Sequence, residues 1–97
     1  MNNSQTLKWG IIGLGNIAHT MAKVLKIIPF NQLYAVASRS PSKAKEFGDK
    51  YSVENICSYA EIVNIKEVDI LYIATTHNFH FDNAKLALEH GKHVLIE

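Results

Sequence analysis

Residues 8–18 read Lys-Trp-Gly-Ile-Ile-Gly-Leu-Gly-Asn-Ile-Ala, an apolar run that breaks into a glycine pattern and then opens a helical pattern. In the pattern Gly13-x-Gly15-x-x-Ala18, the first glycine permits a tight strand-to-helix turn and the second lets the backbone approach a phosphate. The small Ala18 lets the helix pack closely on the strand, and the amides at the helix N-terminus suit an anion. The stretch therefore predicts a dinucleotide-binding turn, although the same residues also suit any sharp strand-to-helix turn.

The composition indicates one small globular domain. The chain has 97 residues, 47% of them hydrophobic, which suffices for one core and is too few for the two lobes of most dehydrogenases. The formal net charge is +1 and the lysines are dispersed, so the sequence has no basic stripe for nucleic acid or an anionic membrane. No signal pattern opens the chain and no apolar run is long enough to span a bilayer. We expect a cytoplasmic protein, with the single cysteine, Cys57, as a buried thiol.

Strand-like apolar runs alternate with helical periodicity in the order of repeated βαβ units. We expect residues 1–6 to be frayed and 7–97 to form a Rossmann-type, doubly wound α/β domain that ends after its fifth strand. Right-handed crossovers give a parallel sheet of strand order 3-2-1-4-5, with the topological switch between strands one and four. The expected strands are 9–14, 33–37, 56–57, 68–74 and 93–96, and the main helices are 16–28, 41–51 and 80–90.

Particular side chains predict where these helices begin and which of their faces are buried. Ser40 followed by Pro41 predicts a helix start, and residues 58–61, Ser-Tyr-Ala-Glu, predict a capping box that opens a brief helix. His19 and His90 are interpreted as helix-surface residues. The apolar periodicity predicts the buried faces Ile17, Met21, Val24, Leu25 and Ile28 in the first helix, Ala44, Phe47 and Tyr51 in the second, and Phe81, Ala84, Ala87 and Leu88 in the last.

Ser38, Arg39 and Ser40 follow the second strand, where an NAD-preferring site would carry Asp or Glu for the ribose hydroxyls. A carboxylate would repel a 2′-phosphate, whereas hydroxyls and a guanidinium donate hydrogen bonds to it, and Lys43 adds a cation one helical turn on. These residues favour NADP over NAD. The alternative is that Ser40 only caps the helix and Arg39 is a solvated loop residue.

Residues 75–80 read Thr-Thr-His-Asn-Phe-His and follow the fourth strand beside the switch point. So many polar groups at this place favour contact with the central or nicotinamide part of a cofactor. The alternative is that Thr76 or Asn78 caps the next helix and that both histidines are ordinary loop residues.

Two histidine pairs, His77 with His80 and His90 with His93, also have a spacing seen in metal sites. Each pair straddles a helix boundary, and no cysteine or carboxylate cluster completes four ligands. We therefore expect no metal site.

Four segments together resemble the glucose-fructose oxidoreductase and inositol dehydrogenase family, and the resemblance covers nearly the whole chain from Leu7. They are Gly13-Leu14-Gly15-Asn16-Ile17-Ala18, the step Ser38-Arg39-Ser40, Ile73-Ala74-Thr75 with His80 after it, and residues 91–97, Gly-Lys-His-Val-Leu-Ile-Glu. In that family the loop after strand four commonly reads Thr-Pro-Asn-x-x-His, and strand five ends in Glu-Lys-Pro. Thr76 and His77 depart from this pattern, whereas Thr75 and His80 match it.

The resemblance implies an NADP-dependent oxidoreductase, near the dihydrodiol and sugar dehydrogenases, that transfers hydride between nicotinamide and a secondary alcohol or ketone of a sugar, cyclitol or diol. It implies a catalytic lysine immediately after Glu97, and therefore no catalytic residue within this chain. It also implies a further substrate domain that carries the oligomer interface, so that the 97 residues alone are inactive. The alternative is a stand-alone nucleotide-sensing regulatory module, because fold alone does not separate the two.

The expected cofactor contacts fall into three groups. Those for the pyrophosphate are Gly13, Gly15, Asn16 and Ile17. Those for the adenosine phosphate are Ser38, Arg39, Ser40 and Lys43. Those for the central and nicotinamide part are Thr75, Thr76, His77, His80 and Glu97. The expected cofactor is NADP, with NAD as the second choice.

Overall fold

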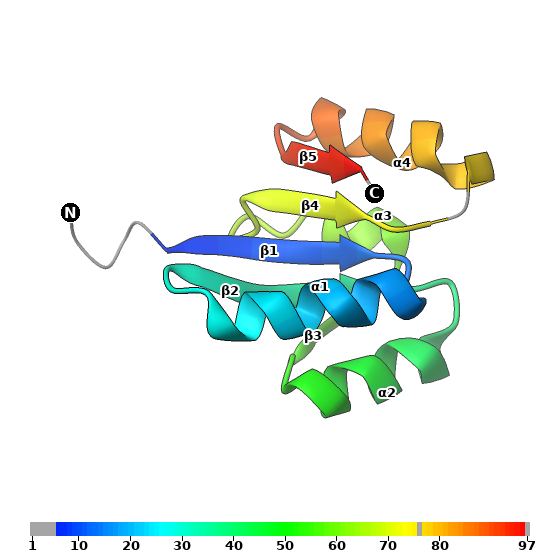
Figure 1. The fold of residues 1–97 in the computed structure, drawn as a ribbon. Helices are drawn as coiled ribbons and strands as arrows, with labels where there is room; N and C mark the ends of the chain where they lie inside the picture. The colour runs from blue at the N-terminus through cyan, green and yellow to red at the C-terminus, as the bar shows by residue number, and fades with distance from the viewer. Residues whose placement is uncertain (1–5, 76, 97) are drawn as a thin grey trace.

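The computed structural model describes residues 6–75 and 77–96, without the side chains of residues 77–81. Within these residues a parallel five-stranded sheet has the order β3-β2-β1-β4-β5, which confirms the predicted topology (Figure 1). The strands are β1 (Leu7–Ile12), β2 (Asn31–Ala37), β3 (Asn55–Cys57), β4 (Ile70–Ile73) and β5 (His93–Ile96). The helices are α1 (Asn16–Ile27), α2 (Pro41–Tyr51), α3 (Tyr59–Ile62) and α4 (His77–Glu89).

Helices cover both faces of the sheet, and each face has its own core. Ile11 packs with α1 and α2 on one face, whereas its neighbour Ile12 packs with α3 and α4 on the other. Successive strand residues point to opposite faces, so a strand buried on both faces needs a continuous apolar run. This arrangement explains why the strands of this chain read as uninterrupted Ile, Val and Leu.

The register of the sheet brings the ends of three strands to one edge. Ile12 lies opposite both Ala37 of β2 and Ile73 of β4. Hydrogen bonds continue the alignment into the loops, because Gly13 N donates to Ala37 O (3.0 Å) and Ala74 N donates to Ile12 O (2.8 Å). The residues that follow β1, β2 and β4 therefore meet at the carboxyl edge, where ligands bind in open α/β sheets.

The predicted buried face of α1 was partly wrong. Ala18, Ala22 and Leu25 are buried against the sheet. Ile17, Val24 and Ile28 instead have exposed fractions of 42%, 39% and 39%. The two alanines let the helix approach the strands closely, so the helix turns its small residues inward and leaves the larger aliphatic stripe at its flank.

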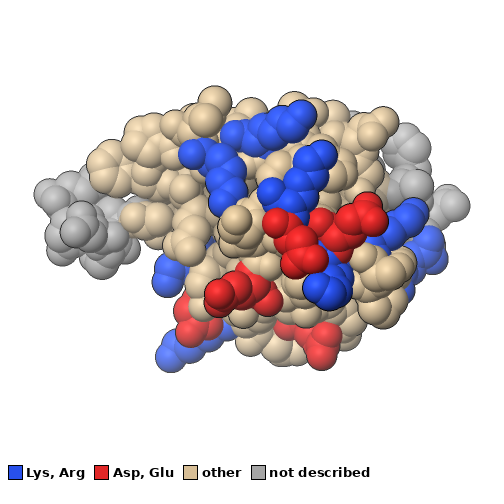
Figure 2. Space-filling view, turned by 90° about the horizontal axis from the view of Figure 1, so that it is seen from below, with Lys and Arg blue, Asp and Glu red and all other residues tan. Residues whose placement is uncertain are grey.

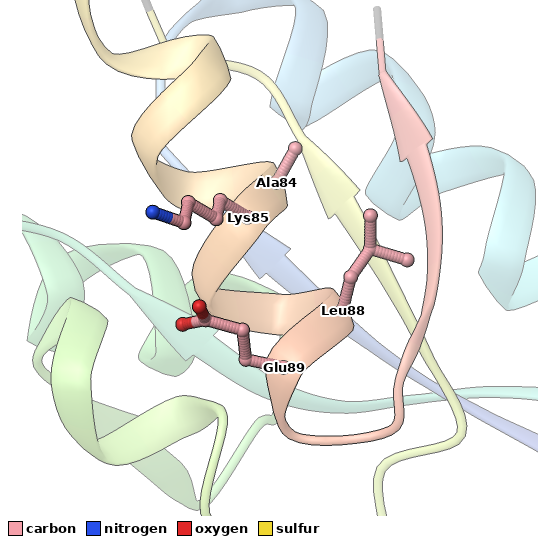
Figure 3. Close-up of a pocket in the computed structure, with 4 residues that line it drawn as sticks. All are labelled: Ala84, Lys85, Leu88 and Glu89. Atoms are coloured by element: carbon pink, nitrogen blue, oxygen red, sulfur yellow. The ribbon is translucent and has the colours of Figure 1, made fainter.

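The predicted buried face of α4 was also partly wrong. Ala87 is fully buried and Ala84 is half-buried, as expected, but Leu88 is 62% exposed. In Figure 3, Ala84 and Leu88 project from one side of α4, and Lys85 and Glu89 project from the other. These four residues line an open hollow of about 600 Å³ on α4. Leu88 lies on the flank of the helix beside β5, the edge strand of the described sheet, so the sheet does not cover it.

Several element bounds differ from the prediction. β1 ends at Ile12 rather than residue 14, because Gly13 has a φ of +90° and turns the chain. β1 and β2 both begin two residues earlier than expected, since Leu7 pairs with Asn31. β4 is shorter than expected, and α4 begins at His77 rather than near residue 80. Apart from Thr6, the expectation of a frayed N-terminus falls outside the described residues.

The predicted capping box at the start of α3 is present. Ser58 Oγ accepts a hydrogen bond from Glu61 N (3.2 Å), and Glu61 Oε1 accepts one from Ser58 N (2.8 Å). Hydrogen bonds from Ser58 to the Glu61 carboxylate lower the pKa of that carboxyl, first the bond from the Ser58 backbone amide and then one from the Ser58 side chain. The box orients the chain where β3 leads into α3, at the same carboxyl edge as the other loops.

We expect Ser58→Ala to lower the free energy of unfolding by about 1 kcal/mol, since it leaves an amide at the start of α3 without its acceptor. Urea unfolding followed by circular dichroism measures this. Ser42→Ala, at an exposed position in α2, is the matched control. An equal or smaller loss for Ser58→Ala than for the control would contradict a stabilising cap.

Candidate cofactor site

The two glycines of the fingerprint have different roles. Gly13 has a φ of +90°, and a Cβ at this position would lie 2.9 Å from Ala74 C, Thr75 N and Thr75 Cγ2. Only glycine fits there without displacing the loop that follows β4. Gly15 has an ordinary φ of −88°, and a Cβ at this position would meet nothing within 4 Å. Gly13 therefore permits the turn, and Gly15 keeps open the space beside it.

The N-terminus of α1 opens at this turn without a side-chain cap and without an acidic residue in its first turn. Ala18 N (3.1 Å) and His19 N (3.2 Å) both donate to Gly15 O. The amides of Asn16 and Ile17 precede these bonds, and helix geometry provides no intrahelical acceptor for amides at that position. The helix end therefore offers N–H groups and a favourable dipole to an anion.

A pocket of about 330 Å³ lies beside the turn. Its lining joins the ends of three strands and includes many of the predicted contacts. The lining residues are Gly13, Leu14, Gly15, Ser38, Arg39, Ser40, Lys43, Tyr59, Ala74 and Thr75. Asn16 and Ile17 are exposed beside it without being part of that lining. The predicted contacts Thr76 and Glu97, and the side chains of His77 and His80, lie outside the described residues.

The hydroxyls after β2 make local hydrogen bonds. Ser40 Oγ accepts from Lys43 N (3.4 Å) as the cap of α2, and Ser38 Oγ accepts from Ser40 N (3.1 Å). Ser40 Oγ also lies 3.1 Å from Ser42 Oγ, and either hydroxyl can be the donor of that bond. When Ser42 donates, the Ser40 hydroxyl keeps its own hydrogen for a ligand, as the Ser38 hydroxyl does. The capping alternative is therefore correct for Ser40 and is compatible with a place in the pocket wall. Arg39 is exposed and lines the same wall.

Tyr59, at the first position of α3, lines the pocket although it is not among the predicted cofactor contacts. It also lines a neighbouring pocket of about 500 Å³ between the start of α2 and β3, which shares Ser38 and Arg39 with the first. The signal was available, because the capping box placed Tyr59 directly after β3 at the carboxyl edge. Cys57, which ends β3, is half-buried rather than fully buried, and burial raises the pKa of its thiol.

Thr75, which lines the pocket, forms a buried polar pair with Asn83, which does not. Asn83 Nδ2 donates a hydrogen bond to Thr75 Oγ1 (3.2 Å), and their exposed fractions are 6% and 8%. Asn83 lies within α4, so the bond ties this helix to the loop after β4. The sequence pattern after β4 predicts a site at Thr75 but gives no sign of Asn83, since helical periodicity alone does not indicate a bond back to the preceding loop.

His19 is more than a surface residue, contrary to the prediction. Its Nδ1 lies 2.7 Å from Tyr51 Oη, and its ring centroid lies 4.6 Å from that of Phe47, so it connects α1 to α2. Burial lowers the pKa of His19 below its ordinary value, and the charges of Lys50 and Lys23 lower it further, whereas Glu46 raises it. His90 is exposed, as expected.

Because the pKa of His19 is lower in the folded chain than in the unfolded chain, the unfolded chain binds more protons at mildly acidic pH. We therefore expect the stability contributed by neutral His19 to be complete above pH 6.5 and to be lost as the pH falls through the folded pKa. Urea unfolding between about pH 5 and pH 7 should show a smaller pH dependence for His19→Gln than for His90→Gln. Parallel curves for the two variants would contradict this.

The described surface shows no concentration of one charge around α2. Figure 2 views this face from below, and Lys and Arg side chains are interspersed there with Asp and Glu.

Within the described part of the chain, no group of three His, Cys, Asp or Glu side chains could hold a metal ion. No helix in that part is long and apolar enough to cross a membrane.

Known proteins are similar to this chain in sequence and in fold. The model of an oxidoreductase family with an NAD-binding Rossmann fold matches residues 7–97. The D-xylose 1-dehydrogenase (NADP(+)) of Hypocrea jecorina is 44% identical over 98% of this chain and 28% of its own length. The trans-1,2-dihydrobenzene-1,2-diol dehydrogenase of Mus musculus is 38% identical over 94% of this chain and 28% of its own length.

A crystal structure of a 3-ketoreductase from Actinomadura kijaniata, in complex with TDP-benzene and NADP, superposes with a TM-score of 0.87. It is 30% identical and is aligned over 93% of this chain and 29% of its own. The chain thus spans less than a third of the length of these proteins, and the matched part is the region that carries the glycine turn and the pocket. The expected resemblance is confirmed, and the chain belongs to the glucose-fructose oxidoreductase and inositol dehydrogenase family of oxidoreductases.

Proposed function

We propose that this chain is the NADP-binding part of an oxidoreductase that transfers hydride between nicotinamide and a secondary alcohol or ketone of a sugar, cyclitol or diol. The observation that carries the proposal is the lining of the pocket at the carboxyl edge. It combines the glycine turn with two serines, Arg39 and Lys43, and none of the lining residues described is a carboxylate. This lining suits a phosphate ester better than a pair of ribose hydroxyls.

Each of three loops would contact a different part of the cofactor. Gly13, Gly15 and the first amides of α1, from Asn16 and Ile17, would hold the pyrophosphate. Ser38, Arg39, Ser40 and Lys43 would hold the 2′-phosphate, and the pocket beside Tyr59 has room for the adenine. Thr75, with the expected contacts Thr76, His77, His80 and Glu97, would face the nicotinamide half. The bound cofactor would accept the hydride from an alcohol or donate it to a ketone, and these residues would bind and orient the cofactor.

The remaining parts of the reaction belong to the longer protein that we propose. By resemblance to the family, a lysine after Glu97 would exchange a proton with the substrate oxygen, and a second domain would bind the polyol or sugar-like substrate and form the oligomer. The 97 residues alone would then be inactive, and the parent enzyme would be cytoplasmic. The names of the relatives, which are two dehydrogenases and a ketoreductase, favour an enzyme over the regulatory module.

Calorimetric titration of the 97-residue chain with NADP and NAD, at matched ionic strength, tests the proposal. Adenosine 2′,5′-bisphosphate is the control ligand, since it carries the 2′-phosphate without the nicotinamide half. We expect a preference for the two 2′-phosphorylated ligands. Equal affinity for NADP and NAD would contradict the 2′-phosphate site, and a folded sample that binds none of the three would contradict the cofactor site itself.

A further inference from the structure

The pair Thr75 and Asn83 is unusual in this molecule. Apart from tyrosines, they are the polar residues that are buried within the described part of the chain. Buried polar groups are the informative exception in a core, because each must find a hydrogen-bond partner to offset its lost hydration. Here the two groups find each other, over a distance of 3.2 Å from Asn83 Nδ2 to Thr75 Oγ1.

The direction of this bond determines what Thr75 can do. An amide NH2 group only donates, so Thr75 Oγ1 is the acceptor, and its own hydroxyl hydrogen remains available to another acceptor. Without Asn83, the hydroxyl could rotate and place its hydrogen elsewhere. Asn83 therefore makes Thr75 a donor of defined orientation.

Thr75 stands at the point where the pocket and the glycine turn meet. It lines the pocket, and its Cγ2 lies where a side chain on Gly13 would collide with it, 2.9 Å from the Cβ position. Thr75 follows β4, which lies beside β1 in the sheet. This place is at the topological switch, away from the Ser38 to Ser40 segment after β2 and toward the central part of a bound dinucleotide.

We propose that Asn83 is a positioning residue that orients the Thr75 hydroxyl to donate a hydrogen bond to an oxygen in the nicotinamide half of the cofactor, beyond the phosphate that is attached to the adenosine. This inference rests on the proposed function, because it assumes that the pocket holds NADP. It adds to that function a residue of α4 that does not line the pocket and that acts only through Thr75.

The first test is Asn83→Leu, which keeps a similar side-chain volume and removes the amide. We expect NADP affinity, measured by calorimetry, to fall about three- to tenfold, the equivalent of one neutral hydrogen bond. Affinity for adenosine 2′,5′-bisphosphate should stay within about twofold, since that ligand lacks the nicotinamide half. Asp82→Leu, at the exposed neighbouring position of α4, is the control and should bind both ligands like the wild type. An equal loss for both ligands, or no loss for either, would overturn the proposal.

Variants of Thr75 give a second test that does not depend on the folding of Asn83→Leu. Thr75→Val should lower the NADP affinity by the same factor as Asn83→Leu. Thr75→Ser, which keeps the hydroxyl, should bind NADP with the affinity of the wild type. The double variant Thr75→Val with Asn83→Leu should bind NADP no more weakly than either single variant. Equal NADP affinity for Thr75→Val and Thr75→Ser would overturn the proposal.

The wild-type chain separates this inference from the proposed function. A wild type that prefers 2′-phosphorylated ligands, combined with unaltered NADP binding by Asn83→Leu, overturns the positioning role alone. A folded wild type that binds neither NADP nor the bisphosphate overturns both.

Discussion

Gly13→Ala is expected to lower the free energy of unfolding by at least about 2 kcal/mol and to abolish measurable NADP binding. Two costs add. The φ of +90° strains any residue with a Cβ by about 1–3 kcal/mol. The new Cβ would also lie 2.9 Å from backbone atoms of Ala74 and Thr75, and such overpacking costs about 1–3 kcal/mol. Relief of that contact would move the loop after β4, which forms part of the pocket wall. Urea unfolding and calorimetric titration measure the two effects.

Gly15→Ala separates binding from folding and is the matched control. Its Cβ would meet nothing within 4 Å, and its φ of −88° is accessible to alanine, so we expect a stability change within about 1 kcal/mol. NADP affinity should nevertheless fall about ten- to a hundredfold, because the methyl group stands where a phosphate would accept a charge-assisted bond from the backbone. A stable Gly15→Ala chain that binds NADP like the wild type would contradict a pyrophosphate at this turn.

Arg39→Asp is expected to reverse the cofactor preference. Loss of a charge-assisted hydrogen bond to the 2′-phosphate costs about 1–3 kcal/mol, which corresponds to roughly 5- to 150-fold in NADP affinity. The new carboxylate would repel the phosphate and could accept hydrogen bonds from ribose hydroxyls, so NAD affinity should be unchanged or higher. Parallel titrations with NADP and NAD at one ionic strength measure the ratio.

Lys45→Asp introduces the same change of net charge on α2, the helix that follows the loop of Arg39. Lys45 is exposed, forms a salt bridge with Asp49 (3.1 Å) and is not part of the pocket lining. Because Lys45 does not line the pocket, this change removes no direct contact with a bound phosphate, so the NADP preference should persist. An equal loss of NADP and NAD affinity in Arg39→Asp, or an equal shift of preference in Lys45→Asp, would contradict a direct contact between Arg39 and the 2′-phosphate.

The strand order and the starts of α2 and α3 could be predicted from short sequence patterns, whereas the start of α4 could not. Continuous apolar runs mark doubly buried strands, Ser40 and Ser58 mark helix starts, and right-handed crossovers permit few topologies. The predicted end of the first strand, at residue 14, was wrong because the chain already turns at Gly13. Gly13 adopts a positive φ, and an apolar pattern does not show where the backbone turns.

The amino-acid sequence by itself determined the parallel sheet, the glycine turn and the meeting of the loops after β1, β2 and β4 at one edge. Contacts between distant residues decided the rest. Periodicity shows that α1 carries aliphatic residues, but only close packing on the sheet selects Ala18 and Ala22 rather than Val24 as its buried face. Likewise, the bond from Asn83 to Thr75 exists only because α4 folds back over the loop that precedes it. A local pattern encodes which element forms, whereas the partner of each side chain depends on how the elements pack together.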